Sequence, residues 1–318
     1  MKRLFSLALF LLFSVSYGQS YAKLIKKADS CYTAKNYALS RDFYAKAFKT
    51  DPESKRNYYN AACAASLTND KKNALKWLET AIQKGYEDIH RIQSDTDLEN
   101  IRKEKKFITI TEPLQKKIAF EEANYDKPLQ QELLAIHQDD QGIRHEYIAA
   151  QKKYGNQSKE VDSLGKIMDL KDSLNLLKIV KILDEKGWVG KNKVGREANQ
   201  AIYLVIQHAD LKTQQKYLPM MREAVKKGNA TPSSLAFLED RVAFREGRKQ
   251  IYGTQVGTHP ATKKKYVLPL EDPDHVDERR SEAGLGTLEE YLSYWNISWD
   301  VEQYKKDLPE LEKLGMFK

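Results

Sequence analysis

Small and bulky residues recur with a period of 34 positions in the first third of this 318-residue chain. A shift by 34 superposes four pairs of positions, Ala28 on Ala62, Ser40 on Ala74, Tyr44 on Leu78 and Ala47 on Ala81. Three of these pairs are small residues, which let two helices pack closely, and the fourth is bulky. Several coincident positions at one period predict stacked helical hairpins.

Helix-breaking residues stand where such units should end. Pro52 closes the first unit and Gly85 the second. The pattern resembles the tetratricopeptide repeat (TPR), here over residues 19–117, with a degenerate third unit in residues 86–107. The resemblance implies a groove that binds a protein or peptide partner. Packing of this short array on the domain behind it is the alternative, and the sequence leaves both open.

The periodicity changes from Pro128 onward. Apolar residues at three- and four-residue spacings, with caps and glycines at the ends, predict a series of helices. These cover residues 130–152, 158–186, 196–209, 211–227, 231–247 and 288–294. We therefore expect a mainly α protein, in which a linker over 118–127 joins the repeats to a helical domain over 128–298. That domain carries one small β-hairpin near 252–270, and a C-terminal tail covers 299–318.

Two of the predicted helices carry polar side chains within almost wholly apolar surfaces. Gln207 and His208 interrupt the helix at 196–209, and Asp240 and Arg241 interrupt the helix at 231–247. An unpaired buried charge is strongly destabilising. These groups must therefore find partners inside the domain.

A histidine grouped with carboxylates and an arginine suits general acid–base chemistry or anion recognition. The catalytic candidates are His208, Asp210, Asp240 and Arg241, and the ligand-binding candidates are Gln207, Tyr252, Thr254, Gln255, Asp140 and Arg144. A structural interpretation stays open for each. His208 would be a core histidine, and Asp210 would cap a helix. Asp240 and Arg241 would form an ion pair that holds the hairpin, and Asp140 would lie on a solvated helix turn and pair with Arg144.

No cofactor and no metal site are predicted. His208-Ala209-Asp210 offers two metal ligands, but no third is fixed by local spacing. The chain has no Gly-rich phosphate loop, no Gly-x-Ser-x-Gly elbow and no His-Glu-x-x-His motif.

Short motifs in the second half of the chain resemble an uncharacterised bacterial domain family. They are Gly187-Trp188, Gln207-His208-Ala209-Asp210, Asp240-Arg241, Gly247, Tyr252-Gly253-Thr254-Gln255 and the segment from Asp277 to Leu285. The likeness covers about residues 128–298, and Val189 departs from it where a proline is expected. No activity is assigned to that family, so the resemblance implies none.

The first residues have the pattern of a secretory signal. Basic Lys2 and Arg3 precede an apolar run, and small residues precede Gln19. We expect residues 1–18 to be a signal peptide and the chain to be exported, either to the periplasm or out of the cell. No later run is long and apolar enough to cross a bilayer, so no stable membrane anchor is expected after cleavage.

Cys31 and Cys63 fall on the first helices of adjacent repeat units. A disulfide would persist in the compartment reached after export. Two small buried residues in a helical interface are the alternative.

The charge pattern argues against nucleic acid as a partner. The formal net charge is +8, but acidic and basic residues alternate, and the longest basic run is Lys263–Lys265. A protein-interaction or ligand-binding module of the cell envelope is therefore the leading functional hypothesis. The alternative is a hydrolase-like enzyme centred on His208 and Asp240.

Overall fold

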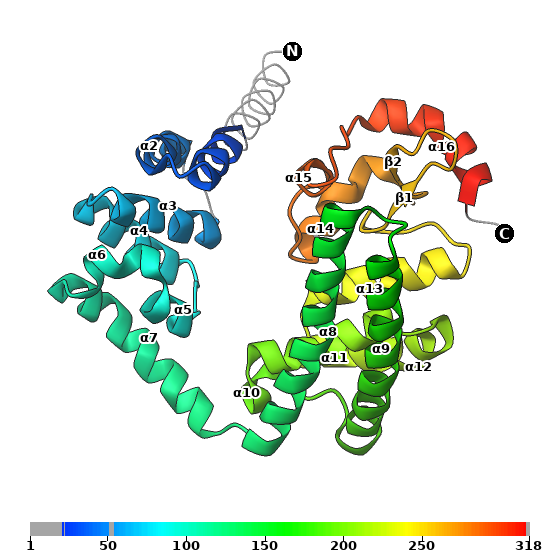
Figure 1. Cartoon of the computed structure of the whole chain (residues 1–318), viewed down its shortest axis with the longest axis horizontal. Helices are drawn as coiled ribbons and strands as arrows, with labels where there is room; N and C mark the ends of the chain where they lie inside the picture. Colours follow the sequence, from blue (N-terminus) through cyan, green and yellow to red (C-terminus); the bar gives the residue numbers. More distant parts are fainter. Residues whose placement is uncertain (1–20, 22, 51–53, 316–318) are drawn as a thin grey trace, which may run out of the picture. The chain divides into compact units, whose positions relative to one another are not determined.

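The computed structural model describes residues 21, 23–50 and 54–315, and this part of the chain is mainly α-helical (Figure 1). It divides between Glu121 and Glu122 into two compact units. The predicted signal peptide, residues 1–18, lies outside the described residues. Within them, no helix is both long enough and apolar enough to span a bilayer.

The N-terminal unit consists of short helices joined by tight turns. Residues 23–33 are helical and precede α2 (Tyr37–Ala47), which ends in the 3₁₀ turn η1 (Phe48–Thr50). Then follow α3 (Lys55–Leu67), α4 (Lys71–Gln83), α5 (Ile89–Ser94), η2 (Thr96–Leu98), α6 (Glu99–Arg102) and α7 (Lys105–Ala123). α7 occupies residues 118–123, which were expected to be a linker.

Burial in this unit follows the 34-residue period. Each of the eight positions that coincide in the sequence is 0% exposed: Ala28, Ser40, Tyr44, Ala47, Ala62, Ala74, Leu78 and Ala81. α3 packs on both α2 and α4. The small residues and the bulky pair thus all lie inside the helical packing, fully removed from water.

The C-terminal unit begins with two long helices, α8 (Lys127–Tyr154) and α9 (Lys159–Lys186), which pack side by side (Figure 1). Next come α10 (Lys191–Val194), α11 (Arg196–His208), α12 (Leu211–Lys226) and α13 (Pro232–Arg245). The main core forms where α11 lies on α8 and α9, and where α12 lies on α13.

The predicted β-hairpin is formed by β1 (Val256–Thr258) and β2 (Lys265–Val267), which pair antiparallel with Val256 opposite Val267. It is followed by η3 (Pro273–His275), α14 (Val276–Glu282), α15 (Leu288–Ser293) and α16 (Val301–Gly315). The predicted fold class, mainly α with one small β-hairpin, is confirmed.

These last elements share a small core of their own, separate from the main one. Its buried members are Val267, Leu270, Val276, Leu288, Leu292 and Tyr304. The Tyr304 hydroxyl, on α16, donates a hydrogen bond to the Leu268 carbonyl at 2.9 Å. The segment expected to be a C-terminal tail therefore contains a packed helix.

Candidate functional site

A pocket of about 210 Å³ opens where α8, α9 and α11 meet. It is lined by Asp140, Asp172, Ser173, Leu176, Val205, His208, Ala209 and Asp210. Three carboxylates and one imidazole thus surround a space large enough for water or a small polar group.

Asp140 is buried within this group of side chains and is 0% exposed. The expectation that it lies on a solvated helix turn is wrong. It shares the inward face of α8 with Leu133, Ile136 and Ile143, all buried, because the 3-4-3 spacing places these four residues on one side of a helix. That spacing was the signal in the sequence that could have shown its burial.

His208, the last residue of α11, contacts this carboxylate. Its Nδ1 lies 3.0 Å from Asp140 Oδ1, and its side chain is 21% exposed. A buried carboxylate on one ring nitrogen favours the tautomer in which Nδ1 carries the proton and donates it to the carboxylate. Nε2 then keeps its lone pair, and His208 lines the pocket.

Arg144 holds the second carboxylate of the group. One of its nitrogens lies 2.8 Å from Asp172 Oδ2 on α9, and another lies 3.2 Å from Asp140 Oδ1. The same guanidinium also donates to the Asp140 carbonyl at 2.8 Å. The expected pairing of Asp140 with Arg144 is therefore present, and it extends across to α9.

The pKa of Asp140 reflects these opposing surroundings. Burial raises it, but hydrogen bonds from His208 and Gln141 and the charge of Arg144 outweigh burial. The pKa lies below the ordinary value, so Asp140 is a carboxylate at neutral pH. An ionised partner is what holds a histidine in a single tautomer and stabilises its protonated form.

Two neighbours of His208 have structural roles. The Asp210 side chain accepts a hydrogen bond from the Thr213 N–H at 2.8 Å and caps α12. Gln207 is 4% exposed, and its amide nitrogen donates to the Phe237 carbonyl at 3.3 Å. Gln207 therefore ties α11 to α13 and is not among the residues lining the pocket.

Asp240 belongs to a different cluster, which holds the loop before the hairpin. It is 0% exposed, and Oδ1 accepts from the N–H groups of Ile251 and Tyr252 at 2.6 and 3.0 Å. Oδ2 accepts from the N–H and the hydroxyl of Thr254, both at 2.9 Å. Burial raises the pKa of Asp240, and these donors oppose the rise. We call this arrangement the Asp240 clamp.

The clamp uses backbone N–H groups in place of the expected ion pair. Among the described residues, Arg241 has no carboxylate within ion-pair distance; it donates to the Gln207 carbonyl at 3.2 Å. Burial lowers the pKa of Arg241, and the nearby charge of Arg245 lowers it further. Gln255 donates through its side chain to the Thr254 hydroxyl at 3.0 Å, and the Tyr252 hydroxyl donates to Glu239 at 3.4 Å.

Three polar residues that hold these clusters together were not among the candidates. Asp172, on α9, accepts a hydrogen bond from Arg144, which lies 28 positions earlier in the sequence. Gln250 donates to the carbonyls of Gln255 and Leu268 beside the clamp. Arg280, 2% exposed, donates to the Tyr252 and Gly286 carbonyls at 2.7 Å. No local spacing in the sequence marks any of the three, because these contacts are set by the packing of separate elements.

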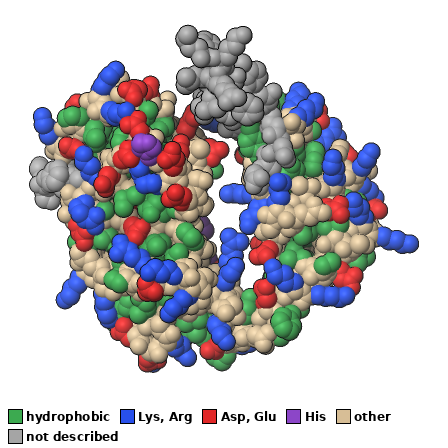
Figure 2. Space-filling view, turned by 180° about the vertical axis from the view of Figure 1, so that it is seen from behind, with side chains coloured by type: hydrophobic (Ala, Val, Ile, Leu, Met, Phe, Trp, Pro, Cys, Tyr) green, Lys and Arg blue, Asp and Glu red, His purple; other side chains and the backbone are tan. Residues whose placement is uncertain are grey.

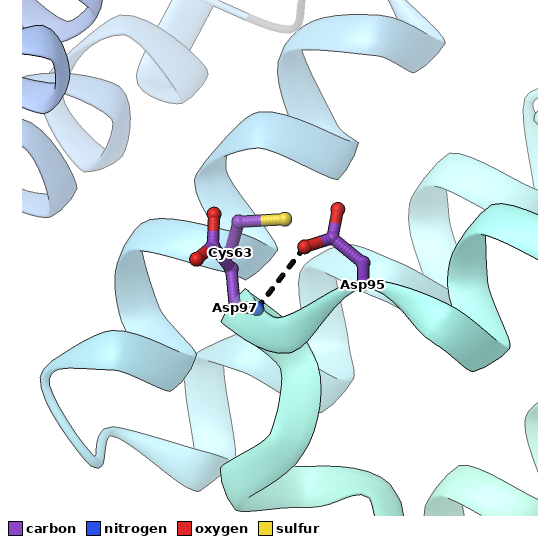
Figure 3. Close-up of side chains that lie close together, drawn as sticks. All are labelled: Cys63, Asp95 and Asp97. Atoms are coloured by element: carbon purple, nitrogen blue, oxygen red, sulfur yellow. Dashed lines mark hydrogen bonds between the residues drawn. The ribbon is translucent and has the colours of Figure 1, made fainter.

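A third polar cluster lies in the N-terminal unit, where Cys63 of α3 faces Asp95 and Asp97 (Figure 3). Asp95 accepts hydrogen bonds from the Tyr59 hydroxyl at 2.8 Å and from the Asp97 N–H at 3.0 Å. The Tyr32 hydroxyl donates to Asp97. Burial raises the pKa of the Cys63 thiol, and the two carboxylates raise it further. Cys31 and Cys63 are not bonded to each other.

The pocket cluster and the Cys63 cluster each bring three potential metal ligands within 4.8 Å of one another. At Asp140, Asp172 and His208, Arg144 already supplies a positive charge between the two carboxylates. At Cys63, burial and the two carboxylates raise the pKa of the thiol, so a zinc ion would have to displace its proton in order to bind the thiolate. The first donor set, with its histidine on a buried carboxylate, suits acid–base chemistry.

Comparison with known proteins places the pocket inside a recognisable domain. The model of a family of unknown function, DUF6624, matches residues 127–302. A chloroplastic protein of Arabidopsis thaliana is 51% identical over 49 residues, a match that spans 15% of this chain and 15% of that protein. No solved structure matches.

Proposed function

Since the chain belongs to the DUF6624 family of unknown function across residues 127–302, we propose a function from the pocket itself, namely hydrolysis with His208 as the general base. The observation that carries the proposal is the 3.0 Å contact between His208 Nδ1 and the buried Asp140 carboxylate beside a pocket. Of the two functional hypotheses raised by the sequence, this contact favours the enzyme.

The chemistry follows from the tautomer. With Nδ1–H directed at Asp140, Nε2 accepts a proton from water, and the water attacks an electrophilic carbon of the substrate. The carboxylate stabilises the imidazolium that forms. The proton then passes from Nε2 to the leaving group, which returns His208 to its starting state.

The charges around the pocket restrict the substrate. The side chains that line the pocket include three carboxylates, Asp140, Asp172 and Asp210, and no lysine or arginine. Arg144 pairs with the first two, and Arg245 donates to the Ala209 carbonyl next to Asp210, so two positive charges lie near three negative ones. An anionic substrate would be repelled at such short range. We therefore propose a neutral or cationic ester, amide or glycoside.

The first test needs no substrate. Nitrogen NMR of histidine-labelled full-length chain should find the Nδ1–H tautomer for His208, and Asp140→Asn should remove that preference. His145, exposed on α8 and outside the pocket, is the reference histidine. An Nε2–H tautomer at His208 contradicts the general-base role.

The second test is turnover. A panel of neutral, cationic and anionic chromogenic esters, amides and glycosides should contain a neutral or cationic substrate that the chain hydrolyses. His208→Gln should then lower kcat by about 10²–10⁴-fold, whereas His145→Gln should not. If His208→Gln leaves turnover unchanged, the domain is better described as a receptor.

For the N-terminal unit we propose a TPR array that binds a protein or peptide partner. The 34-residue period and the complete burial of the eight coincident positions support it. Export to the cell envelope is the matching proposal for location. It is tested by cell fractionation with N-terminal sequencing, and a mature chain that starts at Gln19 is the expected result.

A further inference from the structure

Helix α9 exposes a row of large apolar side chains. Ile167, Leu170, Leu174 and Leu177 are 45%, 61%, 50% and 69% exposed. Their 3-4-3 spacing is that of the a and d positions in a helix that pairs with another helix. We call these four residues the α9 stripe.

The stripe lies on the opposite side of α9 from the core. At 100° per residue, Asp172, Ile179 and Leu183 project away from the stripe. Ile179 and Leu183 are buried at 0% and 1% exposure, and Asp172 reaches the pocket. α9 is therefore apolar on two opposite sides, of which only one is covered within its own unit. Association with a second helix would remove the exposed side, the α9 stripe, from water.

The charges beside the stripe indicate what covers it. Lys166, Lys171 and Lys178 occupy the e and g positions, which flank a helix seam and determine partner choice. Lys171 is paired with Asp139 at 2.7 Å. Among the described residues, neither Lys166 nor Lys178 has an ion pair, and both are exposed. Positively charged side chains therefore flank the α9 stripe.

These flanking lysines disfavour pairing of the stripe with a second copy of the chain. Its residues at the e and g positions beside the stripe are Lys166, Lys171, Ser173, Lys178 and Val180, none of which is acidic. A paired α9 would therefore bring no carboxylate to Lys166 or Lys178, and Lys171 is already paired with Asp139. Like charges across a helix seam oppose association.

We propose that the α9 stripe binds an amphipathic helix of another protein, with acidic side chains flanking its own apolar seam. The four stripe residues span about 15 Å along the axis, at 1.5 Å per residue. A partner helix of about three turns covers this length. The recognition mode is a helix laid along an apolar surface, with charges that select the partner. It does not depend on the activity proposed for the pocket.

The test uses two designed helical peptides with the same leucine seam, one with glutamates and one with lysines at the flanking positions. Fluorescence anisotropy with the full chain should show at least tenfold tighter binding of the glutamate peptide. Lys166→Glu with Lys178→Glu should reverse that preference. Leu170→Ser with Leu174→Ser should abolish binding while the melting temperature is kept, because both residues are at least half exposed.

Three results would overturn the proposal. The first is equal affinity for the two peptides, or no binding of the glutamate peptide. The second is unchanged binding by the Leu170→Ser, Leu174→Ser variant. The third is a dimer of the wild-type chain in sedimentation equilibrium that the same variant dissociates, which would make a second copy the occupant.

Discussion

The Asp240 clamp provides the sharpest test of how the C-terminal unit is held together. In Asp240→Asn, an amide nitrogen replaces one carboxylate oxygen. Placed at Oδ2, it faces the Thr254 N–H and leaves that buried donor without an acceptor, whereas the Thr254 hydroxyl can turn and accept from it. Placed at Oδ1, it would face the N–H groups of both Ile251 and Tyr252. The first orientation is therefore the less costly one.

The cost of that orientation follows from one lost acceptor in a buried site. An unsatisfied buried donor destabilises by about 1–3 kcal/mol, so Asp240→Asn should lower the free energy of unfolding by about 2 kcal/mol. Asp240→Ala, which removes every acceptor, should cost about 4 kcal/mol. For a unit of this size, the amide variant should melt about 4–8 °C lower. Thr254→Val, which removes only the hydroxyl, should cost about 1 kcal/mol.

Urea unfolding followed by circular dichroism measures these differences, and hydrogen exchange locates them. The amides of Ile251, Tyr252 and Thr254 should exchange faster in Asp240→Asn than in the wild type. The reasoning fails if Asp240→Asn unfolds within about 0.5 kcal/mol of the wild type, the range of ordinary surface substitutions. It also fails if the three amides keep their protection.

Two further predictions concern the other clusters. Because the pKa of Asp140 is lowered on folding, its stabilisation is complete above its ordinary pKa and is lost as the pH falls through the folded-state value. The stability gap between wild type and Asp140→Asn, measured by urea unfolding, should therefore shrink from pH 7 to pH 3, and a gap that widens contradicts the assignment. Since burial raises the pKa of the Cys63 thiol, a thiol reagent at pH 8 should label Cys31 promptly and Cys63 only on unfolding; equal rates would contradict its burial.

Helices were predictable from the sequence because their signals are local. The predicted helix at 158–186 and the observed α9 (Lys159–Lys186) differ by one residue, since Ser158 caps the start and Gly187 ends the helix. The C-terminal helix α16 differs from the tail predicted over 299–318, because Tyr304 anchors it to the small core.

The site was predictable only in part. The need of His208 for a partner followed from its apolar helix, but the identity of that partner did not, because Asp140 lies 68 positions earlier. Asp240 was expected to pair with the adjacent Arg241, whereas loop N–H groups 11–14 positions away satisfy it. Periodicity assigns a residue to a face, but long-range packing decides which faces meet.

The surface composition was predictable from the charge pattern. Lysine, arginine and acidic side chains are interspersed over the face seen in Figure 2, as their alternation along the chain indicated. This mixed surface could be predicted without knowing the fold. When a helix buries its apolar side, the charged residues that alternate along it are left in water.

The separate small core around the hairpin has a consequence for how the chain loses its structure. It holds six buried apolar residues, far fewer than the main core of the same unit. A region with so few buried contacts opens at lower free energy than its surroundings. On gentle heating, a protease should therefore first cut between Val256 and Val301, releasing a C-terminal fragment while the helices from α8 to α13 stay resistant.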